Sequence, residues 1–326
     1  MLDVLAIGST VRDVFLEVDF PTFKWSKTPS DKAFILPLGE KLGVKNIKFM
    51  LGGSAANASV TFSRQGFKTG LLSKVGNDIS GKELLSILKK EKVSTKSVST
   101  NAQKTSYSVV ILENGERTIL NYGKGSNNLS IKELSGKSLI SKWWYLSLAG
   151  ESYKLLDKLI PIAKKNGIKI ALNPTKYHIE KGRKNLLSNL KNISFLVLND
   201  EEASALVGIP FKNQKQLFSK LDNLVLGIVA VTSGKNGVTV SDGKKIYKAG
   251  IFKEKKIVDR TGAGDAFGSG FISGLIRKPK DIPYAIKLGS ANATSVVESI
   301  GATPGILKRG EMERSKRFKN LKIKIS

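Results

Sequence analysis

The feature that most limits the fold is a regular alternation of short apolar runs with segments of helical pattern. Each run has the length and composition of a strand buried on both faces. Strands are predicted at residues 4–7, 71–75, 143–148, 168–172, 195–198 and 228–231. Helices are predicted at residues 54–65, 81–90, 153–165, 184–190, 201–207 and 285–298. This alternation predicts an α/β fold, with a mainly parallel sheet and helices on both of its faces.

Two stretches, about residues 14–50 and 105–123, depart from this alternation. They contain short apolar runs separated by turn residues and lysines, at residues 14–18, 34–36, 47–49, 107–112 and 117–122. Asn114-Gly115 marks a hairpin turn between the last two runs. We expect these runs to be short antiparallel strands of a second, small sheet. The sequence shows no linker or internal repeat, so we expect residues 1–326 to form a single domain.

A glycine-rich turn near the C-terminal end opens directly into a helix. Gly262, Ala263 and Gly264 precede apolar residues at helical spacing. The first N–H groups of a helix lack internal partners and carry the positive end of its dipole, so they bind anions. Asp265 lies in the first turn, where the dipole favours an ionised carboxylate that could accept a proton. The sequence contains no P-loop, and the turn lies too late in the chain for a dinucleotide-binding motif.

Composition excludes several other classes of function. The net charge of +27 is typical of nucleic-acid binders, but the lysines are spread along the whole chain, whereas binders cluster cations with aromatic side chains. We therefore expect no nucleic-acid partner. The absence of cysteine and the single histidine, His178, exclude thiolate and multi-histidine metal sites. We expect His178 to be an ordinary surface or loop residue, and Trp143 and Trp144 to pack in the core.

The sequence also bears on the compartment. It contains no apolar run long enough to cross a bilayer, and it begins directly with a strand-like segment. We therefore expect a cytoplasmic protein with no membrane partner.

Two motifs resemble the signatures of the PfkB (ribokinase-like) family of sugar and nucleoside kinases. The string D-x-T-G-A-G-D-x-F at residues 259–267 resembles the second signature, and G-G-x-x-x-N at residues 52–57 resembles the first. The resemblance extends over essentially the whole chain. It implies a ribokinase-like three-layer sandwich, with the small β-sheet as a lid. It also implies ATP-dependent phosphorylation of a hydroxymethyl group on a sugar.

The resemblance assigns residues to catalysis and to the acceptor. Asp265 would be the base, and the N–H groups of Gly262, Ala263 and Gly264 would stabilise the transferring phosphoryl group. The acceptor would be bound by Asp13, Gly52, Gly53 and Asn57. Ribokinases usually carry an asparagine two residues before that aspartate, where this chain has Val11, and this difference argues against ribose itself.

The resemblance also implies a nucleotide site with metal ions. Asn199 and Glu202 match an N-x-x-E motif that would help to hold Mg²⁺ through water, although acidic residues at a helix start are also ordinary caps. The triphosphate and adenine of ATP would be bound by Asn199, Thr232, Ser233, Gly234, Gly237 and Asn292. Asp259 and Thr261 resemble a monovalent-cation (K⁺) site found in some members.

Three alternative functions remain open. A nucleoside kinase would use the same machinery, and a phosphosugar kinase would need cations for a second phosphate, for which Lys124 and Arg117 are candidates. A nucleic-acid-binding protein of the same fold is the non-enzymatic alternative. The lid could also join two copies of the chain in a homodimer.

Overall fold

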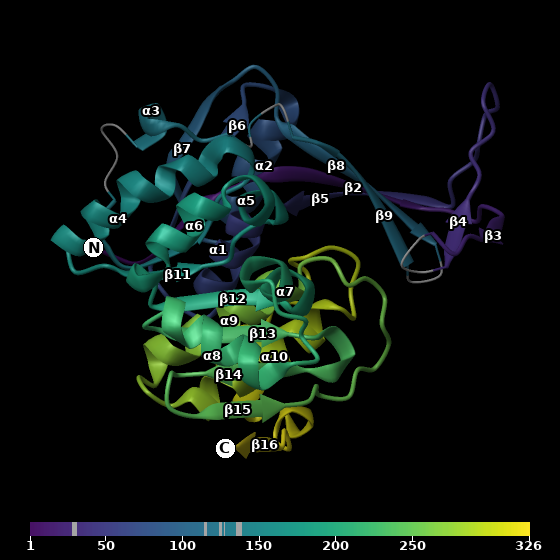
Figure 1. Cartoon of the computed structure of the whole chain (residues 1–326). Coiled ribbons are helices and arrows are strands. Elements are labelled where there is room, and N and C mark those ends of the chain that lie inside the picture. The colour runs from purple at the N-terminus through teal and green to yellow at the C-terminus, as the bar shows by residue number, and fades with distance from the viewer. Residues whose placement is uncertain (28–30, 114–115, 124–125, 127, 135–138) are drawn as a thin grey trace.

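A computed structural model of the protein describes residues 1–27, 31–113, 116–123, 126, 128–134 and 139–326. In the described part of the chain, ten strands form one sheet, whose middle and one edge are parallel and whose other edge is antiparallel (Figure 1). In spatial order the strands are β16 (Ile323–Ile325), β15 (Ile246–Ala249), β14 (Val238–Ser241), β13 (Ile228–Thr232), β12 (Phe195–Asn199), β11 (Lys169–Leu172), β10 (Ser141–Ser147), β1 (Leu2–Gly8), β6 (Thr69–Gly76) and β7 (Ser94–Ala102). The strands from β13 to β7 in this order are parallel, so the predicted mainly parallel sheet is confirmed.

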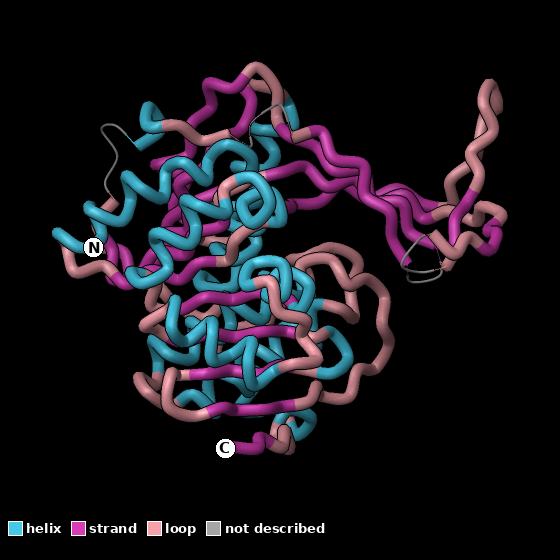
Figure 2. The backbone as a smooth tube through the Cα atoms, in the orientation of Figure 1, coloured by secondary structure: helices cyan, strands magenta, loops and turns pink. Residues whose placement is uncertain are grey.

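Helices cover both faces of this sheet (Figure 2). The longer ones are α1 (Ser54–Arg64), α2 (Ile79–Lys90), α4 (Leu156–Lys165), α6 (Arg183–Asn189), α7 (Asp200–Val207), α8 (Gln214–Leu224), α9 (Ala263–Arg277) and α10 (Ile282–Val296). Shorter ones are α3 (Ile131–Leu134), α5 (Lys176–Lys181) and α11 (Glu311–Arg314). No helix among the described residues is long and apolar enough to span a bilayer.

Side chains on the two faces of the sheet pack into two different hydrophobic clusters. In β12, Leu196 and Leu198 pack with residues of α4, α6, α7 and α8, whereas Phe195 and Val197 pack with residues of α9 and α10. Phe195 stacks on Phe271 of α9, with ring centroids 4.6 Å apart. Because successive side chains of a strand point to opposite faces, a run that is apolar throughout must be covered on both sides. The predicted three-layer arrangement is therefore confirmed.

Close packing of α9 against α10 fixes the position of α9. A Cβ added at Gly274 would lie 2.6 Å from Cα of Ala285, and one at Gly289 would lie 2.8 Å from the carbonyl oxygen of Phe267. The two backbones can approach this closely only because these positions lack side chains. The start of α9, which carries Asp265, is thereby held against the core.

A separate four-stranded sheet, the lid, projects from the body of the molecule (Figure 1). Its strands lie in the order β5 (Asn46–Gly52), β2 (Val11–Glu17), β8 (Ser106–Glu113) and β9 (Glu116–Tyr122). One expectation was wrong, because β2 and β8 are parallel. Both strands leave the body in the same direction, so they meet side by side with the same polarity. Beyond the lid, β3 (Thr22–Lys24) and β4 (Lys32–Phe34) form a two-stranded arm that replaces the strand predicted at residues 34–36.

His178 is a second correction, since it is buried in α5 and not on the surface. Its ring stacks on Tyr153, and its Nε2 lies 3.1 Å from Oδ1 of Asn185. Burial lowers the pKa of His178. The ring is therefore a packed, neutral part of the helical layer. Trp144 is fully buried as expected, and its Nε1 donates to the carbonyl of Leu139.

Candidate active site

The candidate site lies where four parallel strands end. Ser147, Asn173, Asn199 and Thr232 end or directly follow β10, β11, β12 and β13, and all four line one cavity of about 240 Å³. Asp265 lines the same cavity from the start of α9. Ligands of open α/β sheets bind at this edge because the loops after the strands converge there.

Asp265 is held by two amide side chains from distant parts of the chain. Nδ2 of Asn173 donates to its Oδ1 and Nδ2 of Asn57 donates to its Oδ2, each over 3.0 Å. Burial raises the pKa of Asp265, and hydrogen bonds from Asn57, Ser54 and Asn173 oppose that rise. A carboxylate that is fixed in orientation and made more basic is suited to accept a proton. The sequence analysis missed Asn173. Its position directly after a buried strand was the feature that could have identified it as a candidate site residue.

The turn before α9 depends on one glycine. Gly262 has φ +77°, and a Cβ added to it would lie 2.3 Å from Cβ of Ala302. A side chain at this position would be both strained and blocked. A Cβ at Gly264, by contrast, would meet no atom within 4 Å, because that residue borders open cavity. The backbone at Gly264 therefore lies next to free space, as an anion site requires, whereas the N–H of Ala263 donates to the carbonyl of Arg260 over a long 3.4 Å.

Asp13 and the paired glycines form a compact unit at the base of the lid. A Cβ added to Gly52 would lie 2.1 Å from Oδ2 of Asp13, and Gly53 has φ +93°, so both positions exclude side chains. Burial raises the pKa of Asp13 to about 7, a hydrogen bond from Ser108 opposes the rise, and the nearby charges of Asp259 and Asp265 add to it.

The four residues predicted to bind the acceptor lie beside the smaller cavity, and none of them lines its wall. They are Asp13, Gly52, Gly53 and Asn57. Asn57 contacts Asp265 directly, and Ser54, which follows the paired glycines, lines the cavity. Oδ1 of Asn57 is buried and has no hydrogen-bond partner among the described residues. The predicted set Asp13, Gly52, Gly53 and Asn57 is thus brought together around the predicted base.

A second cavity, of about 340 Å³, adjoins the first on the predicted nucleotide side. Thr232, Gly234 and Gly237, which were predicted to bind the nucleotide, line it. Ser233 is not in its wall, and its buried hydroxyl has no partner among the described residues. Further along, the wall consists mainly of small and apolar residues, namely Ile251, Ile257, Phe267, Ser290, Ala293, Thr294 and Val297.

Asn292, which was predicted to hold adenine, does not face this cavity. It is fully buried; its Nδ2 donates to the carbonyl of Ala266, and its Oδ1 accepts from the backbone N–H of Leu307. The amide thus joins α9, α10 and the chain after residue 301. Its neighbours Ser290, Ala293 and Thr294 on α10 line the cavity instead.

Asn199 and Glu202 form a reciprocal cap at the start of α7. Oδ1 of Asn199 accepts from the N–H of Glu202 over 2.7 Å, and Oε2 of Glu202 accepts from the N–H of Asn199 over 2.8 Å. Burial raises the pKa of Glu202, and its hydrogen bond from Asn199 opposes the rise. Both residues also border the smaller cavity. No cluster of three metal-ligating acidic or histidine side chains exists within the described ranges. A Mg²⁺ ion bound here would therefore take most of its ligands from water and phosphate.

Asp259 fastens the turn before α9 to the loop around Gly301. Its Oδ1 accepts from the N–H and the hydroxyl of Thr261, and its Oδ2 accepts from the N–H of Gly301 over 2.9 Å. The predicted cation residues Asp259 and Thr261 are therefore brought together, and their contacts in this structure are with each other and with Gly301. Asp259 is almost completely buried, so each of these hydrogen bonds offsets the cost of burying its charge.

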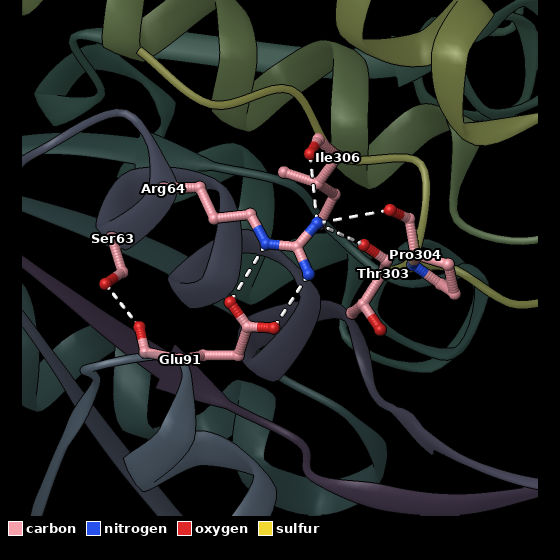
Figure 3. Close-up of polar contacts among 6 residues, drawn as sticks. All are labelled: Ser63, Arg64, Glu91, Thr303, Pro304 and Ile306. Atoms are coloured by element: carbon pink, nitrogen blue, oxygen red, sulfur yellow. Dashed lines mark hydrogen bonds and ion pairs between the residues drawn. The ribbon is translucent and has the colours of Figure 1, made fainter.

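Arg64, at the end of α1, holds the rest of that loop (Figure 3). Its guanidinium donates to the carbonyls of Thr303, Pro304 and Ile306. It also forms a bidentate ion pair with the carboxylate of Glu91. A planar guanidinium can satisfy both partners at once, which a lysine could not do. The two ends of α1 therefore serve the same site: Asn57 contacts Asp265, and Arg64 anchors the loop that contacts Asp259.

The burial of Asp13 predicts a stability that falls as pH rises. The unfolded carboxyl ionises near 3.8, whereas the folded one keeps its proton to about pH 7, so the folded state binds more protons between these values. The free energy of unfolding should therefore fall over this window, by on the order of 4 kcal/mol at most. Asp13→Asn should remove this contribution to the fall, so its advantage over wild type should be larger at about pH 8 than at about pH 5.

Urea unfolding at the two pH values measures this effect. Asp19→Asn, which changes an exposed carboxylate next to the lid, is the matched control. An Asp13→Asn advantage that is the same at both pH values would contradict the assignment of the raised pKa to Asp13.

Comparison with known proteins agrees with the fold. The model described as pfkB family carbohydrate kinase matches residues 1–309. Ribokinase from Haemophilus influenzae is 28% identical over 283 residues, covering 84% of this chain and 89% of that protein. An ATP-dependent 6-phosphofructokinase from Thermoanaerobacterium thermosaccharolyticum is 28% identical over 276 residues, covering 81% and 84%.

Among solved structures, Arabidopsis thaliana ribokinase complexed with ribose and ATP superposes with a TM-score of 0.78 at 22% identity, covering 98% of this chain and 99% of that one. At this identity the likeness shows the fold, and the match to the family model carries the assignment. The chain belongs to the pfkB family of carbohydrate kinases.

Proposed function

We propose that the protein transfers the γ-phosphoryl group of ATP to a hydroxymethyl group of a sugar. The observation that carries this proposal is the meeting of the two cavities, which share Ala263 and Gly264 at the start of α9, with Asp265 in the wall of the smaller one. A nucleotide in the larger cavity and a sugar in the smaller one would thus meet at an anion site beside a base.

The proposed reaction is one displacement at phosphorus. Asp265 takes the proton of the acceptor hydroxyl as its oxygen bonds to the γ-phosphorus, the bond to the bridging oxygen breaks, and ADP leaves. The N–H groups of Gly262, Ala263 and Gly264 would stabilise charge on the moving phosphoryl oxygens. Asp13 and Asn57 would bind other hydroxyls of the sugar. An ionised Asp13 would accept hydrogen bonds from these hydroxyls, which it lacks when no sugar is bound.

Two metal ions complete the proposal. Asn199 and Glu202 would hold Mg²⁺ through water beside the phosphates, and the ion would supply positive charge that offsets the charge of the phosphate oxygens. Asp259 and Thr261 would adjoin a monovalent cation that steadies the turn. With ATP as the phosphoryl donor, we propose the cytoplasm as the compartment.

A panel of acceptors tests the proposed function. ADP release should occur with one or more sugars, and ribose, other pentoses, hexoses, nucleosides and sugar phosphates should be compared at equal concentration. The best acceptor should be a free sugar. Turnover only with a nucleoside or a sugar phosphate would support one of the alternative kinases. No turnover, together with salt-sensitive binding of nucleic acid, would support the non-enzymatic alternative.

Replacement of the base tests the mechanism. Asp265→Asn should lower turnover by about 10²–10⁴-fold, because an amide cannot accept the proton. Urea stability should stay the same or rise, because the change removes a buried charge, and calorimetric affinity for ATP should change little. Glu201→Gln, at an exposed carboxylate one residue from the cap, should keep wild-type turnover. Wild-type turnover in Asp265→Asn would show that the mechanism is wrong.

We also propose that two copies of the chain pair through the outer face of the lid. The strand register places Ile47, Phe49, Leu120 and Tyr122 on the face opposite Asp13, and each is 47–58% exposed. Apolar side chains grouped in this way are typical of an interface.

Sedimentation should therefore give the mass of a dimer, and Phe49→Lys with Leu120→Lys should give a monomer. Ile79→Lys, at an exposed position of α2, is the control. A wild-type monomer at micromolar concentration would contradict this proposal.

A further inference from the structure

The inner face of the lid carries an arginine in line with Asp13. In the register of the lid, Asp13 lies beside Ser108, and Ser108 lies beside Asn121 on β9. Four residues further out, Glu17 lies beside Leu112, and Leu112 lies beside Arg117. Because side chains alternate between the faces of a sheet, Arg117 shares the face of Asp13, roughly 13 Å further along the strands.

Arg117 reaches the junction of the two cavities from this position. It lines both the larger and the smaller cavity, although its strand belongs to the lid and the other walls belong to the body. Arg260, in the turn between Asp259 and Thr261, also lines both cavities. Two guanidinium groups, one from the lid and one from the catalytic turn, thus border the space where the phosphoryl group would pass.

The two arginines are not paired with the carboxylates that line the same cavities, which are Asp200 and Glu254 in the larger and Glu202 and Asp265 in the smaller. Within the described part of the chain, neither the Arg117 nor the Arg260 side chain takes part in an ion pair or a hydrogen bond. Two cations that border one space repel each other unless an anion lies between them. A guanidinium offers several N–H donors in one plane, which suits phosphate oxygens.

We propose that Arg117 is a catalytic residue that the lid supplies to the γ-phosphoryl group, opposite Arg260. This inference rests on the proposed function and adds a residue to it. During transfer, charge is spread over the three outer oxygens of the phosphoryl group. The N–H groups of the turn stabilise it from one side, and Arg117 donates hydrogen bonds to it from the lid. The lid would thus supply both Asp13 to the acceptor and Arg117 to the phosphate.

The position of Arg117 also distinguishes contact with the transferring phosphoryl group from binding of a second phosphate on the acceptor. A residue that binds a second phosphate of the acceptor should touch only the acceptor side, whereas Arg117 also borders the nucleotide cavity. Lys124, the other cation considered for such a phosphate, lies outside the described residues. The two roles predict different kinetics, since loss of an acceptor contact raises the acceptor KM and loss of a transition-state contact lowers kcat.

Kinetics of Arg117→Ala test the proposal, with the best acceptor from the panel. We expect kcat to fall by about 100-fold or more, with the acceptor KM changed less than about 3-fold. Arg117→Lys should recover only part of this loss, because lysine keeps the charge but not the planar donors. The matched control is Lys48→Ala, since Lys48 is also a cation on the inner face of the lid, but it pairs with Glu17 and lines neither cavity. It should keep wild-type kcat.

Calorimetric binding of inorganic tripolyphosphate, with Mg²⁺, gives a readout that needs no acceptor. Arg117→Ala should weaken its binding about 10-fold, and Lys48→Ala should not. Wild-type kcat in Arg117→Ala, or a raised acceptor KM with unchanged kcat, would overturn the proposal. If the wild-type protein phosphorylates no acceptor, the proposed function fails, and unchanged tripolyphosphate affinity in Arg117→Ala would then overturn the role of Arg117 separately.

Discussion

The rest of the site depends on how one buried carboxylate is held. Asp265 receives one amide from α1 and another from the end of β11, so segments far apart in the sequence meet at two oxygen atoms. A buried charge is costly unless hydrogen bonds satisfy it, and the same bonds fix the direction in which its lone pairs point. The packing of α9 on α10, the strain-tolerant Gly262 and the anchoring of Asp259 all serve to keep this carboxylate and the adjoining N–H groups in one place.

The parts of the molecule that follow local rules could be predicted from the sequence. The apolar runs predicted the positions of most parallel strands to within a few residues, and the glycine-rich turn predicted the start of α9. Both kinds of pattern depend on neighbouring residues alone. Strands β7 and β16 and helix α8 were not predicted. In β7 most residues are polar, since this strand lies at the edge of the sheet, and its pattern is therefore that of a loop.

The site residues divide in the same way. Those in the two signatures were predicted, and the structure brings them together around Asp265. Asn173 was missed because its function comes from a contact across 92 positions of sequence. Asn292 was misassigned because a buried amide looks the same in sequence whether it faces a ligand or the core. His178 was taken for a surface residue, since nothing local indicates the stacked Tyr153 or the amide of Asn185. The parallel pairing of β2 and β8 likewise depends on how both strands leave the body.

Helix α1 links the two halves of the site as a rigid spacer. Asn57 and Arg64 are seven residues apart, which in an α-helix is within about 20° of two full turns, so both side chains leave the same side of the helix. One residue inserted between them would rotate Arg64 by about 100° and turn it away from the loop that it holds. Changes of length in this protein during evolution should therefore be absent from α1 and collect in the arm beyond the lid, since neither β3 nor β4 lines either cavity.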